Sequence, residues 1–128
     1  MENLEIESTE RTPRIFFDYD NHHFEISGEA YPENSDEFFR PVMDALQEYI
    51  ASGASDKISF LFKLIYFNSS SARVLMKLFE LLDEAAESRS VEIEWHYHEE
   101  DDTMEEFGEE FAEDMENASF QLKSYNDG

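Results

Sequence analysis

The sequence I-S-F-L-F-K-L-I-Y-F at residues 58–67 decides the fold, because it is the strongest predicted strand in the chain. Eight of these ten residues are aliphatic or aromatic. Such a nearly continuous apolar run is typical of a central strand that other elements cover on both faces. We therefore expect this strand in the middle of a sheet, with cover over both of its faces.

A helix and another strand are predicted directly after the central strand. Residues 72–87 repeat apolar side chains at helical spacing, and residues 91–97 alternate apolar and polar side chains, as strands with one buried face do. This arrangement predicts a right-handed crossover between parallel strands. Residues 99–116 hold eleven acidic residues and no Lys or Arg, but their apolar members recur at offsets of three and four and predict an amphipathic helix.

Strands are also predicted towards both ends of the chain. Residues 14–18 and 23–27 flank a turn and predict a hairpin, to which Leu4 and Ile6 can add a short edge strand. Residues 120–123 predict a last short strand after the acidic helix.

The first helix is predicted to begin at Asn34 or Ser35, either of which can cap it, with Glu37 at capping-box spacing from Asn34. Pro41 conflicts with a regular helix, because an interior Pro costs about 3 kcal/mol. A distinct first turn, or a helix that starts nearer Pro41, would resolve the conflict. The order β-β-α-β-α-β-α-β predicts one α/β domain over residues 1–128, with a mixed β-sheet packed with α-helices.

The composition excludes several classes of protein. The 128 residues include 9 Lys and Arg and 32 Asp and Glu, so the net charge is 9 − 32 = −23. A broad basic face for nucleic acid or anionic lipid is therefore excluded, although 41% hydrophobic residues are too many for a disordered acidic tail. The absence of Cys excludes disulfides and thiolate metal sites. With no signal peptide and no apolar run of about 18 residues, we expect a cytoplasmic protein without a membrane span.

Few residues offer catalytic or metal-binding chemistry. His96 and His98 lie on one face of a predicted strand and could bind Zn or Ni, but two polar-face histidines are the simpler interpretation. Asp18 and Asp20 resemble the start of a calcium loop, but His23 stands where that loop requires Gly. No Gly-rich phosphate loop and no nucleophile motif is present. We therefore expect no enzyme, no cofactor and no metal.

Four polar residues, Asn68, Ser69, Ser70 and Ser71, follow the central strand where the next helix begins. In open α/β sheets, functional sites gather at the carboxyl edge of the strands. A helix cap explains one such residue but not four. A phosphate on one of these serines would meet the positive end of the helix dipole and its free N–H groups. From the residues alone, a structural cap and a phosphorylation site both remain open.

The charge around these serines differs from that of the rest of the chain. Residues 57–79 contain four basic and no acidic residues. Ser69, Arg73 and Lys77 are spaced by four, so they share one face of a helix that starts at Ser69. The alternative is that Arg73 and Lys77 are ordinary solvated helix residues.

Several segments resemble the SiaC family of bacterial regulatory proteins. They are Y-P-E-N-S at residues 31–35, Y-F-N-S-S-S-A-R at 66–73, W-H-Y at 95–97 and G-E-E-F-A-E-D at 108–114. The match extends over residues 4–122, in order and with similar gaps. Members of this family resemble anti-sigma-factor antagonists, with a SpoIIAA-like or STAS-type fold and partner-switching logic.

The resemblance implies a non-enzymatic signalling protein. In the family, a hydroxyl residue after the central strand is phosphorylated by a dedicated Ser/Thr kinase (SiaB-like) and dephosphorylated by a PP2C-type phosphatase (SiaA-like). The unphosphorylated form binds and activates a diguanylate cyclase, which links it to cyclic-di-GMP and biofilm formation. The acceptor position falls on Ser69, with Ser70 and Ser71 as neighbouring alternatives.

Other residues are candidates for contact with the phosphate or the partner. The candidates for contact with either the phosphate or the partner are Asn68, Arg73 and Lys77. The candidates for contact with the partner alone are Tyr31, Pro32, Glu33 and Asn34. The segment 31–34 serves equally well as a helix entry. Competing hypotheses are a constitutive acidic adaptor, an antagonist-like protein with a different basic partner, and an enzyme that uses His96 and His98.

Overall fold

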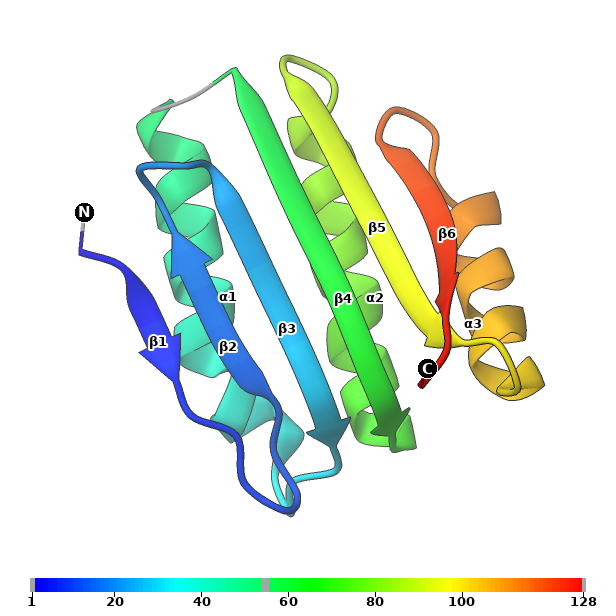
Figure 1. The fold of residues 1–128 in the computed structure, drawn as a ribbon. Helices are drawn as coiled ribbons and strands as arrows, with labels where there is room; N and C mark the ends of the chain where they lie inside the picture. Colours follow the sequence, from blue (N-terminus) through cyan, green and yellow to red (C-terminus); the bar gives the residue numbers. More distant parts are fainter. Residues whose placement is uncertain (1, 54–55, 128) are drawn as a thin grey trace.

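The computed structural model describes residues 2–53 and 56–127, which form one sheet with helices on one of its faces (Figure 1). Within these residues, no helix is long and apolar enough to cross a membrane. The elements in chain order are β1 (Leu4–Ile6), β2 (Arg14–Asp18), β3 (His23–Ala30), α1 (Ser35–Ser52), β4 (Lys57–Phe67), α2 (Ser69–Ala85), β5 (Ser90–His98), α3 (Asp102–Glu113) and β6 (Ser119–Tyr125).

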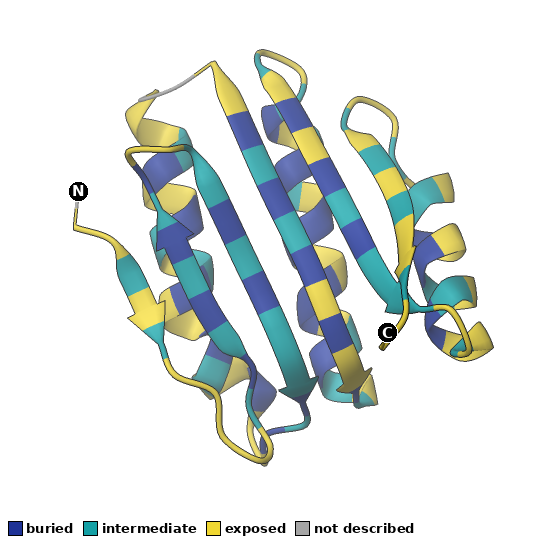
Figure 2. Cartoon of the chain, in the orientation of Figure 1, coloured by how far each residue is buried: buried dark blue, intermediate teal, exposed yellow. Residues whose placement is uncertain are grey.

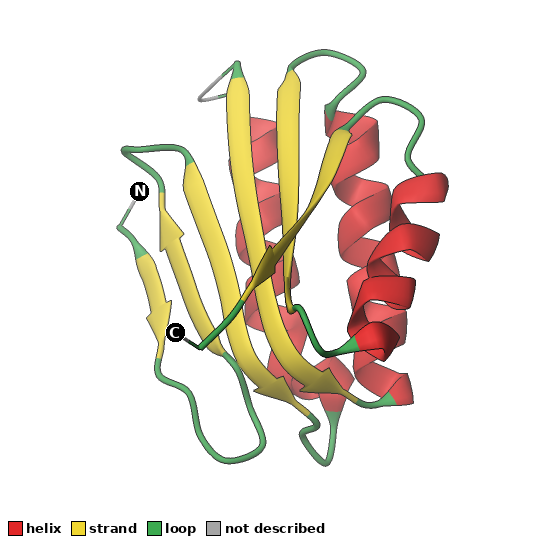
Figure 3. Cartoon of the chain, turned by 45° about the vertical axis from the view of Figure 1, so that its right-hand side comes forward, coloured by secondary structure: helices red, strands yellow, loops and turns green. Residues whose placement is uncertain are grey.

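The six described strands lie in the sheet in chain order, from β1 to β6. The pairs β1–β2 and β2–β3 are antiparallel, and the pairs β3–β4, β4–β5 and β5–β6 are parallel. Each parallel pair is joined through a helix, and crossovers of one hand between neighbouring strands bring all three helices to the same face (Figure 3). The predicted α/β class, with a mixed sheet packed with α-helices, is confirmed, and β1 is the short edge strand around Leu4 and Ile6.

The central strand β4 is covered on one face only, so the prediction of cover on both faces is wrong. Phe60 and Phe62 are buried under the helices, whereas Leu61 is half-buried and Lys63 and Ile65 are exposed on the opposite face (Figure 2). Ile65 is 58% exposed. The reason is topological: because every crossover has the same hand, no helix of residues 2–53 and 56–127 reaches the second face.

Helix α1 begins at Ser35 and continues through Pro41, so neither a distinct first turn nor a later start is needed. Asn34 is its N-cap, and the Oδ1 of Asn34 accepts a hydrogen bond of 3.0 Å from the Glu37 N–H. Pro41 is exposed, on the side of the helix away from the sheet. Only the helical hydrogen bond to the Glu37 carbonyl is lost there, and solvent can hydrate that oxygen.

Helix α3 lies close against the sheet because it has no side chain at one position. A Cβ atom on Gly108 would lie 2.5 Å from Cδ1 of Trp95 on β5. The Trp95 indole N–H donates to the carbonyl of Met104, at 3.0 Å, which fixes the start of α3 over β5. Phe107 and Phe111 therefore pack on Phe67, at the end of β4.

Candidate functional site

Helix α2 is capped by Asn68 rather than by a serine. The Oδ1 of Asn68 accepts the Ser71 N–H at 2.9 Å, and the Asn68 carbonyl accepts the Ala72 N–H at 2.9 Å. These bonds satisfy the first turn as a cap does. The three serines that follow are therefore not required as caps.

The three serines at the start of α2 have different surroundings. Ser71 is fully buried, at 0% exposure, and its Oγ lies 3.1 Å from the Oγ of Ser35 on α1. Ser70 is half-buried, donates its hydroxyl proton to Asn68 at 3.1 Å, and has its Oγ 2.7 Å from that of Ser35. Ser69 is exposed, and its hydroxyl forms no hydrogen bond with any residue that the structure describes.

An open apolar cavity of about 420 Å³ lies beside the Ser69 hydroxyl. Aromatic rings from β4 and α3 form much of its wall, and Tyr66 is 52% exposed. A hydroxyl group at the edge of an exposed apolar surface is well placed to affect the binding of another molecule there. The lining residues are Tyr66, Phe67, Asn68, Ser69, Ala72 and Phe107.

The half-buried Tyr31 of segment 31–34 adjoins this apolar surface. The rings of Tyr31 and Tyr66 meet edge to face, with their centroids 5.7 Å apart. Arg11 lies over the Tyr31 ring at 5.6 Å and forms an ion pair of 3.4 Å with Glu33. Partial burial, followed by the nearby carboxylate of Glu29, raises the pKa of the Tyr31 hydroxyl. This hydroxyl is therefore neutral near pH 7.

The other two residues of the segment have structural roles. Pro32 is buried, and Asn34 caps α1. The Asn68 N–H donates to the Ala30 carbonyl at 3.1 Å, which holds the end of β3 against the start of α2. Pro32 and Asn34 thus set the helix entry, whereas Tyr31 and Glu33 lie at the surface, where contact with a partner stays a prediction.

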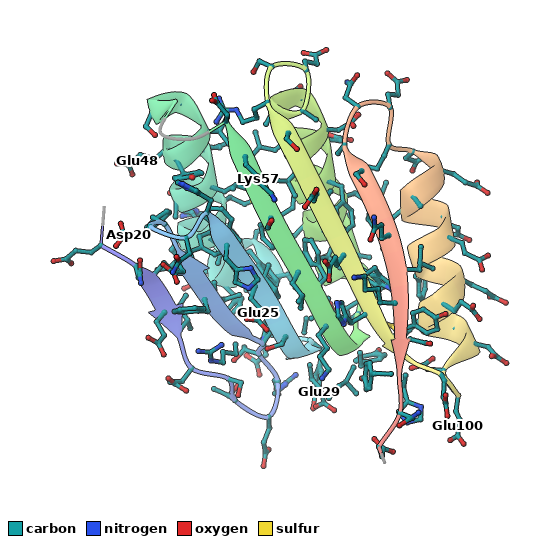
Figure 4. The ribbon with its side chains drawn as sticks, turned by 45° about the horizontal axis from the view of Figure 1, so that its top comes forward. Asp20, Glu25, Glu29, Glu48, Lys57 and Glu100 are labelled. Carbon is teal, nitrogen blue, oxygen red and sulfur yellow. The ribbon has the colours of Figure 1, made fainter. Side chains whose placement is uncertain are left out.

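The four basic residues of segment 57–79 divide between two faces of the molecule. Arg73 and Lys77 are exposed on α2, and neither forms an ion pair with a described residue. Lys57 pairs with Glu92 at 3.7 Å, and Lys63 lies over the Tyr125 ring at 4.5 Å, both on the open face of the sheet. Figure 4 shows Lys57 on that side of β4. Alternation along a strand sends these two lysines away from α2, so only Arg73 and Lys77 share a helix with Ser69.

Comparison with known proteins gives the family. A sequence model described as the SiaC family regulatory phosphoprotein matches residues 6–125. The chain belongs to the SiaC family. The family predicted from the four sequence segments is therefore confirmed.

Proteins of Pseudomonas aeruginosa are similar to this SiaC-family chain. The crystal structure of apo-SiaC is 34% identical, covers 97% of this chain and 100% of its own, and has a TM-score of 0.90. The crystal structure of diguanylate cyclase SiaD in complex with its activator SiaC is matched at 34% identity over 93% of this chain and 98% of that chain, with a TM-score of 0.85. An uncharacterised protein of strain UCBPP-PA14 is 36% identical over 115 residues, which are 89% of this chain and 90% of that protein.

The two histidines of the enzyme hypothesis lie on the open face of the sheet, away from the start of α2. The Nε2 of His96 lies 2.9 Å from Glu94, and the Nε2 of His98 lies 3.1 Å from Asp127. Among residues 2–53 and 56–127, no group of three or more His, Asp or Glu side chains could hold a metal ion.

Three residues at this candidate site have no distinctive sequence signal. Ser35 could be recognised only as an alternative cap for α1, and Tyr66 only as part of an apolar strand. Phe107 belongs to the apolar stripe of an acidic helix. Their proximity to Ser69 arises because β3, β4 and β5 are parallel and end at the same edge of the sheet.

Proposed function

We propose that this chain is a non-enzymatic signalling protein of a partner-switching system, and that its unphosphorylated form binds and activates a diguanylate cyclase. A similar SiaC of P. aeruginosa is described as the activator of such a cyclase. The observation that carries the proposal for this chain is that the exposed Ser69, whose hydroxyl has no hydrogen-bond partner among the described residues, lines an apolar cavity. The proposed location is the cytoplasm, where ATP for the kinase and GTP for the cyclase are present.

Ser69 is the proposed phosphate acceptor. Ser71 has no exposed surface, and Ser70 has its hydroxyl proton committed to Asn68. A kinase can approach Ser69 without breaking any described hydrogen bond of that side chain. These differences favour Ser69 over its two neighbours.

The proposed modification is a transfer of phosphate between oxygens. A SiaB-like kinase would form a bond between the Ser69 Oγ and the γ-phosphorus of ATP, while the bond from that phosphorus to the β–γ bridging oxygen breaks. ADP then leaves, and the hydroxyl proton passes to a base of the kinase. A PP2C-type, SiaA-like phosphatase would reverse the state by transferring the phosphoryl group to water.

The proposed consequence is electrostatic. A phosphate adds about −1.5 to −2 charge at pH 7 and binds water strongly. At the edge of the cavity formed by Tyr66 and Phe107, that hydrated charge opposes a partner that must displace water from the same surface. Arg73 lies one helical turn after Ser69 and can attract the phosphate. Lys77, a further turn away, is expected to contribute less.

Phosphorylation and cyclase assays of matched variants test this proposal. The protein is treated with a SiaB-like kinase and ATP, its intact mass is measured, and each form is then added to a SiaD-like cyclase with GTP. We expect one phosphate on the wild type and none on Ser69→Ala. We also expect Ser69→Asp to lower cyclase activation at least about tenfold, equivalent to about 1.4 kcal/mol of binding.

Ser119→Ala, which removes an exposed hydroxyl on β6, is the matched control and should behave as the wild type. Full phosphorylation of Ser69→Ala would reject Ser69 as the acceptor. If Ser69→Asp and the phosphorylated protein both activate the cyclase as strongly as the unmodified wild type, the blocking mechanism is rejected.

The net charge of −23 supports a second candidate, a constitutive acidic adaptor for a basic partner. Such an adaptor would bind through long-range attraction, which salt screens. Binding that weakens strongly with salt and is equal for Ser69→Ala and Ser69→Asp would favour this adaptor. Binding that follows the state of Ser69 would favour the switch.

A further inference from the structure

A buried serine from another helix lies against the start of α2. Ser35 is the first residue of α1 and is only 3% exposed. Its Oγ lies 2.7 Å from the Oγ of Ser70 and 3.1 Å from that of Ser71. Helices α1 and α2 begin next to each other because Ala30 and Phe67, at the ends of β3 and β4, are paired in register.

The hydroxyl protons of this cluster have one consistent order. The Oδ1 of Asn68 can only accept, so Ser70 donates to Asn68. The Ser70 Oγ must then accept from Ser35, and the Ser35 Oγ must accept from Ser71. Each of the three hydroxyl groups donates once in this chain of hydrogen bonds, which ends at the cap of α2.

We propose that Ser35 is a positioning residue that restricts phosphorylation to Ser69 by holding the hydroxyl groups of Ser70 and Ser71 in this chain. The proposal rests on the proposed function, because it requires a kinase that acts at the start of α2. It adds a residue from a different helix, 34 positions earlier in the sequence, to the control of the site.

The physical reason lies in what phosphate transfer requires of an acceptor. Its Oγ must present a lone pair to the γ-phosphorus of ATP, and its proton must pass to a base of the kinase. At Ser70, one of the two lone pairs of the Oγ accepts from Ser35 and the proton is donated to Asn68. The proton must therefore leave Asn68, and the Oγ must turn its remaining lone pair towards the kinase against the hold of Ser35. At Ser69, neither constraint exists among the described residues.

Replacing Ser35 tests this assignment. Wild type, Ser35→Ala, Ser35→Thr and Ser71→Ala are phosphorylated with the SiaB-like kinase and ATP, and the phosphate at each serine is measured by fragment mass spectrometry. Ser35→Ala should carry about threefold to tenfold more phosphate at Ser70 than the wild type, the factor expected for one lost hydrogen bond. Ser35→Thr keeps the hydroxyl and should return the phosphate at Ser70 to the wild-type level.

Ser71→Ala separates positioning from general loosening of the helix start. It removes the first donor of the chain but leaves the bonds from Ser35 to Ser70 and from Ser70 to Asn68, so it should be modified only at Ser69. Incomplete helical ellipticity of Ser35→Ala would show that this variant is partly unfolded. Ser35→Cys is then used in its place, because Cys fills nearly the same volume with a weak hydrogen-bonding group. It should show the same increase of phosphate at Ser70.

The outcomes separate this inference from the proposed function. A folded Ser35→Ala or Ser35→Cys protein modified only at Ser69 overturns the role of Ser35 and leaves the Ser69 switch intact. Equal modification of Ser69 and Ser70 in the wild type also overturns it. A wild type that accepts no phosphate at all refutes the proposed function itself.

Discussion

At the scale of single residues, hydrogen-bond partners separate side chains of the same type. Asn68, Ser70 and Ser71 are engaged with each other and with Ser35, whereas the hydroxyl of Ser69 is free of described partners. The four polar residues after β4 thus form one cap, two linking hydroxyl groups and one exposed hydroxyl group. The assignment of the phosphate to Ser69 stays a prediction that the experiments above test.

Gly108→Ala is expected to destabilise the fold, although Ala normally favours a helix interior by about 1 kcal/mol over Gly. The added methyl group would lie 2.5 Å from Trp95, so α3 must move outward from β5. We expect a loss of about 1–3 kcal/mol in the free energy of unfolding, measured with urea. Thr103→Ala, at an exposed position of the same helix, should be neutral or slightly stabilising. Unchanged or higher stability of Gly108→Ala would contradict the close contact.

At the scale of elements, α2 holds the connection between α3 and β6 through one carboxylate. Asp83 accepts backbone N–H groups from Glu116, Asn117 and Ala118, the shortest at 2.8 Å. Burial raises the pKa of Asp83, but these three donors outweigh it and hold the pKa below its ordinary value of 3.8. The carboxylate of Asp83 thereby joins the connection between α3 and β6 to helix α2.

Asp83→Asn is expected to lower the free energy of unfolding by about 1 kcal/mol near pH 7, because a neutral amide accepts more weakly from the same N–H groups. Since the folded-state pKa is depressed, the contribution of Asp83 is present above the unfolded-state pKa and is lost as pH falls through the folded-state pKa. The difference between wild type and variant should be constant from about pH 7 to about pH 5 and shrink below about pH 4.

Glu84→Gln removes the same charge from an exposed neighbouring position of α2 and is the control for Asp83→Asn. It should have little effect on stability. A deficit of Asp83→Asn that remains constant down to about pH 3 would show that charge on the carboxylate is not what stabilises the connection.

At the scale of the whole molecule, the negative charge is large and unevenly distributed. Acidic residues are abundant on α3, whereas the open face of the sheet carries Arg14, Lys57, Lys63 and Lys123. Several of these cations pair with acids of the sheet, such as Lys123 with Glu94 at 3.6 Å. The acidic side chains on the outer surface of α3 therefore repel one another.

The thermal stability of the protein should rise with salt. Screening reduces the repulsion within a folded chain of charge −23. We expect the melting temperature to increase by about 3–5 °C between about 20 mM and 300 mM NaCl, for about 1 kcal/mol of relief. The double variant Glu106→Lys, Glu110→Lys, exposed on α3, should melt higher at low salt and respond less to added salt. A melting temperature that falls with NaCl would contradict this account.

The periodicity of the sequence determined the type and order of the elements, because that information is local. Alternation with a period of two marked β5, and offsets of three and four marked α3 despite the eleven acidic residues of segment 99–116. The family segments around residues 31–35 and 66–73 identified the SiaC family, and the run from Asn68 to Ser71 indicated the start of α2 as the candidate site.

Only the tertiary structure decided which faces and neighbours these elements have. Crossovers of one hand left the second face of β4 open, so the apolar run at residues 58–67 gave a wrong expectation of cover on both faces, and Lys63 points away from α2. The contact of Ser35 with Ser70 depends on two parallel strands that end together, which no local pattern records. Local propensities set each element, but which side chains meet depends on contacts between residues far apart in the sequence.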